Sequence, residues 1–285
     1  MFPRVASVRS SVGCAFNCSF CVVPFMMHRK YIQRDPEAVV EDIAGLAEEY
    51  VYFVDDEMFI NARRCAEIAR LLIERGVRKK YISWARADTI CKHRDLFALW
   101  KRAGLSLLYV GLESMKAETL DEYNKGIDPA TNRRAVETLR ELGIGLHAAL
   151  MVEPEFTRQD FMRLRETVAA VAPAETSFTV FSPPPGTPLW EETRDRFICP
   201  DPYSFYDCMH TLVKPTLPLK DFYGQFALLY LLGVRNNPWR RNKVRVPFCD
   251  FLRFMYRGFL YGMALKGIYR DYAFLAEEGS APPGG

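Results

Sequence analysis

Several features that would assign a function at once are scarce in this chain of 285 residues. The net charge is only +3, from 38 basic and 35 acidic residues. Because the two signs are nearly balanced, the composition argues against a nucleic-acid partner. No uncharged apolar run approaches the ~20 residues of a membrane-spanning helix. Residues 1–30 lack the apolar core of a signal peptide. We therefore expect a cytoplasmic protein, either fully soluble or in peripheral contact with a membrane surface.

The eight cysteines include no pattern of paired spacings, which argues against a disulfide framework. Five of them are scattered, and we expect these to be buried as small hydrophobic residues: Cys65, Cys91, Cys199, Cys208 and Cys249.

The other three cysteines, Cys14, Cys18 and Cys21, stand in a C-x3-C-x2-C run with Phe20 just before the third. Three thiolates from one short loop can hold three irons of a [4Fe–4S] cube and leave the fourth iron open, whereas electron-transfer clusters are closed by a fourth cysteine. The alternative is a zinc site with His28 as fourth ligand. Zinc spacings normally come as two paired dyads, so the pattern favours the cluster.

Up to about residue 182, short apolar runs alternate with amphipathic stretches, which predicts repeated βα units and a parallel sheet. Helices are expected over 35–49, 61–76, 94–104, 117–123, 129–143 and 158–171. A complete eight-unit barrel would need two more units. The predicted strands are Val5–Val8, Val51–Val54, Tyr81–Ala85, Leu105–Leu112, Ile144–Val152 and Ser177–Phe181.

The chain is divided by composition into three parts. We expect a barrel over 1–190, a mostly helical region over 191–275 and a disordered Gly/Pro tail over 276–285. The aromatic and basic stretch 250–275 has two open interpretations. It forms either a helix packed on the barrel, or an apolar lid or membrane-surface face for a hydrophobic substrate.

Polar residues end several predicted strands, at the edge where α/β barrels keep their sites. Three acids follow the second strand at 55–57, although like charges repel there unless cations lie nearby. Trp84 and Arg86 share a face at the third strand, and a guanidinium suits a carboxylate ligand. The alternative for Arg86 is a salt bridge at the rim. Glu113 ends the fourth strand, and the alternative for it is a surface ion pair.

On the fifth strand, strict alternation places His147 on the lumen face together with small residues. A lone histidine there has either a catalytic or substrate-binding role, or an ordinary structural one.

The cysteine spacing with Phe20 resembles the signature of the radical S-adenosylmethionine (radical SAM) superfamily. The likeness extends over about residues 4–190. Within the superfamily, this part of the chain is similar to the cobalamin-dependent group, which contains methyltransferases and an anaerobic ring cyclase. Runs at 206–212 and 222–226 are similar to hopanoid C-3 methylases. The segments that carry the resemblance are Asp55-Asp56, Trp84–Asp88, Gly111–Ser114, Asn124–Gly126, Gly143-Ile144 and Pro185–Pro188.

The resemblance implies an α/β fold: a partial (βα)6 TIM-type barrel of parallel strands with a C-terminal helical extension. It implies a [4Fe–4S] cluster on Cys14, Cys18 and Cys21, whose open iron binds SAM for reductive cleavage to a 5′-deoxyadenosyl radical. An electron donor of flavodoxin or ferredoxin type is implied as partner. The implied SAM-binding residues are Phe20 through its backbone, Asp55 or Asp56, Trp84, Arg86 and Glu113.

The implied reaction is methylation of an unactivated carbon of a hydrophobic, hopanoid-like substrate, with oxidative cyclisation as the enzymatic alternative. A zinc-organised interaction module is the non-enzymatic one. Members of the cobalamin-dependent group carry a cobalamin-binding domain before the barrel, often with an Asp-x-His-x-x-Gly segment, and no Asp-x-His occurs here. We expect this chain to be a fragment of a longer protein. The alternatives are a partner chain that supplies cobalamin, or an activity that does not use it.

Overall fold

The structure is a computed structural model that describes residues 4–233 and 248–275, so the predicted tail lies outside the described residues. The chain forms two compact units. The first runs up to Leu150 and includes Pro173–Ser177, and the second comprises Met151–Ala172 and the chain from Phe178 onward. No helix in the described part is long and apolar enough to cross a membrane.

The first unit is built on a parallel sheet, which confirms the predicted α/β class with six strands. Each predicted strand lies within two residues of an observed one. The strands β7 and β8 continue from this unit into the second. In sheet order the strands are β1 (Val5–Val8), β4 (Tyr50–Phe53), β5 (Lys80–Ala85), β6 (Leu105–Glu113), β7 (Gly145–Val152) and β8 (Glu175–Val180).

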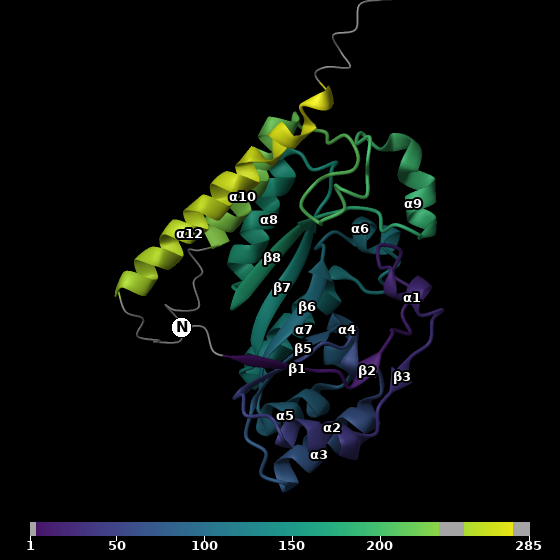
Figure 1. Ribbon diagram of the computed structural model, residues 1–285, viewed down its shortest axis with the longest axis vertical. Coiled ribbons are helices and arrows are strands. Elements are labelled where there is room, and N and C mark those ends of the chain that lie inside the picture. Colours follow the sequence, from purple (N-terminus) through teal and green to yellow (C-terminus); the bar gives the residue numbers. More distant parts are fainter. Residues whose placement is uncertain (1–3, 234–247, 276–285) are drawn as a thin grey trace, which may run out of the picture. The chain divides into compact units, whose positions relative to one another are not determined.

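Alternation along the strands separates a helix-covered face from a lumen face. In β7, Leu146 and Ala148 are buried, whereas the intervening His147 and Ala149 are only partly covered. This confirms the predicted face of His147. Helices α2, α3 and α5 pack beside one another (Figure 1). Besides α1 (Val23–Met26), the α-helices of this unit are α2 (Pro36–Ala44), α3 (Ala62–Glu74), α4 (Ala87–Lys92), α5 (Arg94–Ala103), α6 (Ala117–Glu122) and α7 (Pro129–Leu142).

Helix starts follow local capping chemistry. Asp35 accepts hydrogen bonds from the Glu37 and Ala38 amides at the start of α2, and Asn61 accepts one from Arg64 at the start of α3. Two details differ from the sequence prediction. Helix α2 ends at Ala44 rather than near residue 49, and α4 directly after β5 was not predicted, because six residues are too few to show a helical period.

The predicted cluster loop is closed at its base by a small antiparallel pair, β2 (Ser11–Val12) with β3 (Ile32–Gln33), and contains the short helix α1 (Val23–Met26). Gly13 has a φ of +91°, and a Cβ there would lie 2.1 Å from the Lys30 carbonyl oxygen. Only glycine fits this backbone conformation beside that carbonyl. Strands of two residues carry no readable alternation, so this closure was not predicted.

The second unit is helical, with α8 (Arg158–Val171), α9 (Pro188–Thr193), α10 (Leu219–Gly233) and α12 (Phe248–Gly267). Helix α10 contacts α8 and α12 (Figure 1). Phe222, Tyr223 and Phe226 of α10 are fully buried. The prediction of a mostly helical region over 191–275 is wrong for 201–218, which is irregular. Prolines remove helical donors there, at Pro202, Pro215 and Pro218.

The five scattered cysteines only partly follow the expected burial. Cys65 and Cys199 are buried. Cys208 and Cys249 are exposed, and Cys91 is intermediate, so the prediction is wrong for these three. Cys208 stands at a turn with a φ of 63°, and Cys249 lies at the start of α12, where neither position faces a core.

Candidate active site

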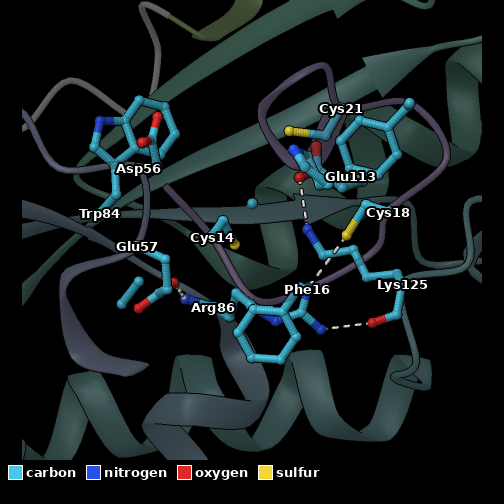
Figure 2. A pocket seen from close by; sticks show the side chains of 14 residues that line it. Cys14, Phe16, Cys18, Cys21, Asp56, Glu57, Trp84, Arg86, Glu113 and Lys125 are labelled. Carbon is cyan, nitrogen blue, oxygen red and sulfur yellow. Dashed lines mark hydrogen bonds and ion pairs between the residues drawn. The ribbon is translucent and has the colours of Figure 1, made fainter. Parts of the chain in front are cut away.

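A cavity of about 210 Å³ lies where the cysteine loop meets the C-terminal ends of β4, β5 and β6. Figure 2 shows the side chains that surround it. Eight of the ten predicted site residues line this cavity, and Asp55 and His147 do not. The eight are Cys14, Cys18, Phe20, Cys21, Asp56, Trp84, Arg86 and Glu113.

The three thiols are the part of the cavity that suits iron. Burial raises the pKa of Cys14 to about 11 and also raises the pKa of Cys21, so metal uptake must release the protons of these two thiols. Among the described residues, no three His, Cys, Asp or Glu side chains converge on one ion. A cubane takes each thiolate on a different iron, so three thiols of one loop suit a cluster.

Arg86 joins the end of β5 to the cysteine loop. Its Nη1 donates to the Cys18 sulfur at 3.3 Å, and its Nη2 donates to the Lys125 carbonyl oxygen at 2.5 Å (Figure 2). Its Nε donates to Asp88 at 2.9 Å, and the guanidinium lies over the Phe16 ring. The donors of Arg86 are therefore engaged by protein groups, and its charge is placed beside the Cys18 thiol.

The structure separates the acids that follow β4. Asp55 is buried and accepts from the Ser10 amide at 3.0 Å, from the Ser10 hydroxyl at 2.7 Å and from the Ser11 hydroxyl. It therefore holds the end of β1 and does not face the cavity. Asp56 accepts from the Gly13 amide at 2.7 Å and lines the cavity.

Glu57, the third acid, is fully covered, and it accepts from the Phe59 amide at 3.2 Å and the Arg86 amide at 2.8 Å. Burial raises its pKa to about 7, against the opposing effect of those amides. Glu57 also lines the cavity, so two of the three acids reach it.

Across the cavity, Glu113 forms an ion pair with Lys125, with 2.7 Å between Oε1 and Nζ (Figure 2). The side chains are 12% and 4% exposed. Glu113 has a φ of 54°, and the β6–β7 register shifts between Gly111 and Glu113. A Cβ on Gly111 would lie 2.2 Å from that Oε1 and 2.9 Å from Nζ, so the ion pair occupies the space that glycine leaves open.

Sequence reasoning did not name Lys125 as a site residue. The available signal was the Asn124-Lys125-Gly126 turn, whose Asn124 and Gly126 both have positive φ. The turn directs the Lys125 carbonyl to Arg86 and its ammonium group to Glu113. A lysine between two turn residues normally extends into solvent, so only the fold shows that it is buried.

A row of aromatic side chains runs along the lumen face from the cavity. Trp84 lines the cavity, donates its indole N–H to the Tyr52 hydroxyl and lies 4.8 Å from Tyr109 between ring centroids. Tyr109 stacks on His147 at 4.0 Å. The row follows from parallel register, since Trp84 is opposite Tyr109 and Tyr109 is opposite His147.

His147 ends this row with both ring nitrogens partnered. Nδ1 lies 3.1 Å from a Glu175 carboxylate oxygen, and Nε2 lies 2.9 Å from the Ser177 hydroxyl. Both partners come from β8, two residues apart, and therefore from the same face of that strand. The residue is thus a positioned histidine outside the cysteine cavity.

The radical SAM superfamily model matches residues 8–168, which is more than half of the chain. The chain belongs to this superfamily, whose members cleave SAM at a [4Fe–4S] cluster.

Among curated proteins, the chain is 32% identical over 222 residues to the hopanoid C-3 methylase of Methylococcus capsulatus, covering 78% of this chain and 43% of that protein. It is 31% identical over 222 residues to the anaerobic magnesium-protoporphyrin IX monomethyl ester cyclase of Cereibacter sphaeroides, covering 74% of this chain and 36% of the cyclase. The chain thus spans less than half the length of both relatives.

Two solved structures share the fold. One is OxsB with aqua-cobalamin and SAM bound, with a TM-score of 0.62, 17% identity and coverage of 92% of this chain and 46% of OxsB. The other is the methyltransferase TsrM from Kitasatospora setae with cobalamin and a [4Fe–4S] cluster, with a TM-score of 0.59, 20% identity and coverage of 75% of this chain and 44% of TsrM. At such identities the likeness shows the partial-barrel fold, as predicted.

Proposed function

We propose that this chain is the catalytic domain of a radical SAM C-methyltransferase that acts on a hydrophobic, hopanoid-like substrate. One observation carries the proposal: the three motif cysteines line a cavity at the C-terminal strand ends, in a chain similar to a hopanoid methylase. Cobalamin is proposed as a second cofactor, because OxsB and TsrM bind it. A flavodoxin- or ferredoxin-type donor supplies the electron.

Cys14, Cys18 and Cys21 hold the cluster in this proposal. When bound, the cluster and SAM supply one-electron cleavage of a sulfonium bond. Arg86 supports the cysteine loop and does not take part in the reaction itself. Its hydrogen bond to the Cys18 sulfur and its positive charge stabilise the deprotonated thiolate that iron requires. Asp56 holds the start of the same loop through the Gly13 amide.

Glu113 and Lys125 suit the methionine end of SAM, which carries one ammonium and one carboxylate group. A carboxylate accepts from the former, and a lysine donates to the latter. Because the two side chains already neutralise each other, the cavity holds this pair without a net buried charge before SAM binds. Trp84 and the Phe20 backbone are proposed to contact the remainder of SAM, and Asp55 to position β1 rather than to touch SAM.

His147 is proposed to contact the substrate. Its link to the cavity runs through Tyr109 and Trp84, and Glu175 orients the ring by its hydrogen bond to Nδ1. A histidine fixed on both nitrogens can hold or move one proton at Nε2 through the Ser177 hydroxyl.

Anaerobic reconstitution with iron and sulfide, followed by dithionite and SAM, tests the core of the proposal. We expect 5′-deoxyadenosine from the wild type and none from Cys18→Ser. The matched control is Cys91→Ser, because Cys91 lies outside the cavity and its weak hydrogen bond to the Thr131 carbonyl suits a hydroxyl equally. Bound zinc with no product would overturn the proposal, as would a full iron load with no product.

The second candidate is oxidative cyclisation, which is favoured by the similarity to the ring cyclase. Cobalamin and a hopanoid added to the reconstituted enzyme separate the two reactions. Transfer of a labelled methyl group from SAM to the lipid supports methylation. Conversion of the lipid without incorporation of the labelled methyl group supports cyclisation.

A further inference from the structure

Helix α12 carries two different long faces, and both are apolar. The inner face packs on α10: Gly262 and Leu265 are buried, and a Cβ on Gly262 would lie 2.7 Å from a Leu231 methyl carbon. Tyr261 also contacts Tyr230, with 5.3 Å between ring centroids. Through this face α12 packs on α10.

The outer face of α12 is an apolar stripe exposed to solvent. Its members recur at i, i+4, i+7, i+8 and i+11, the spacing that normally faces a core. Each is 46% to 64% exposed. We call this set the outer stripe: Leu252, Tyr256, Phe259, Leu260 and Met263.

Basic residues border the outer stripe on both sides. Each residue advances about 100° around the helix, which places Arg253 and Arg257 on one side and Lys266 on the other. All three are exposed, and Arg270 follows in the next turn. No acidic residue occurs from 251 to 270. An apolar stripe edged by cations, with no carboxylate along it, is complementary to an anionic lipid surface.

We propose that α12 docks the enzyme on an anionic membrane, with the outer stripe inserted at the boundary between headgroups and acyl chains. Long basic side chains beside the stripe reach the phosphates while their carbon stems remain in the apolar layer. The occupant is a lipid surface rather than a protein, because a protein interface normally pairs charges of both signs, and the charged residues beside the stripe from 252 to 263 are all basic. The proposal concerns α12 alone and does not depend on the reaction proposed above.

Sedimentation with lipid vesicles tests the proposal without any cofactor. The wild-type chain is expected to bind vesicles containing about 30% phosphatidylglycerol, to bind pure phosphatidylcholine much more weakly, and to be released by high salt. Met263→Asp is expected to lower the partition coefficient at least about tenfold. The matched control is Met162→Asp on α8, a methionine of similar exposure in the same unit, which should bind as the wild type does.

Circular dichroism first establishes that each variant is folded. Folded wild type that fails to bind anionic vesicles at low salt would overturn the proposal, and so would equal binding by Met263→Asp. A dimer that Met263→Asp dissociates, without vesicle binding, would assign the outer stripe to a second copy of the chain and equally overturn it. Arg253→Glu with Arg257→Glu should reduce binding to anionic vesicles and leave the weak binding to phosphatidylcholine unchanged.

Discussion

Replacement of Gly111 by alanine should weaken SAM binding while the barrel stays folded. The added Cβ would lie 2.2 Å from Glu113 Oε1 and 2.9 Å from Lys125 Nζ, inside van der Waals contact with both. Both atoms are the free ends of flexible side chains, and no positive φ constrains Gly111. The ion pair must therefore move, whereas the backbone of β6 need not.

The size of the loss in SAM affinity follows from the contacts that the Glu113–Lys125 pair is proposed to make with SAM. A charge-assisted hydrogen bond is worth about 1.5–3 kcal/mol, so loss of one such contact to SAM raises the Kd about 10- to 100-fold. The cost to folding is smaller than the ~3–5 kcal/mol for deletion of one partner of a buried pair, because both charges remain and can pair elsewhere. Alanine also recovers about 0.5–1 kcal/mol over glycine within a strand.

Equilibrium dialysis of labelled SAM against the reconstituted protein measures the affinity, and urea unfolding measures the stability. Gly224→Ala is the matched control, since a Cβ there meets nothing within 4 Å and α10 tolerates alanine. Lys125→Gln, which removes the charge and shortens the side chain by one atom, should lower the affinity similarly. Wild-type SAM affinity in both folded variants, Gly111→Ala and Lys125→Gln, would refute the assignment of this pair to the SAM site.

Three further predictions concern the loop, a buried acid and the histidine. Gly13→Ala places a Cβ 2.1 Å from the Lys30 carbonyl and should cost about 1–3 kcal/mol in the loop, seen as a reduced iron load after reconstitution. The pKa of Glu57 is raised to about 7, so the unfolding free energy of the metal-free chain should fall by up to about 3 kcal/mol as pH rises from the ordinary carboxyl range through 7. Glu57→Gln should remove that fall in urea titrations, and an unchanged pH profile would contradict the burial argument. His147→Gln should lower methyl transfer about 100-fold and leave uncoupled 5′-deoxyadenosine release intact, and an equal loss of both in product assays would place the histidine in the SAM site.

Local chemistry made much of this fold predictable. The strands alternate in hydropathy, and helix caps such as Asp35, Asn61 and Asp128 act within three residues along the chain. The cysteine motif is also local, so the superfamily, and the loop predicted to hold the cluster, followed from residues 14–21. The region 201–218 departed from prediction because its composition suggested helix, while its prolines prevented one.

The order of the acids after β4 illustrates what a local pattern leaves open. Asp55, Asp56 and Glu57 are equivalent in the sequence, but alternation sends Asp55 toward Ser10 and Asp56 toward the cavity. Their environments also differ, since burial raises the pKa of Glu57. The direction and the burial of each acidic side chain depend on the residues that pack around the strand end, and these residues cannot be identified from the sequence of that strand.

The elements of the barrel, the cysteine loop and the lumen face of His147 could be predicted from the sequence, since each depends on periodicity or spacing within one segment. Which distant groups meet depends on the tertiary structure. Glu113 reaches Lys125 because of a left-handed residue, a register shift and a missing Cβ at Gly111. The exposure of the outer stripe likewise depends on the tertiary structure, because α12 has two apolar faces and packing on α10 can bury only one of them.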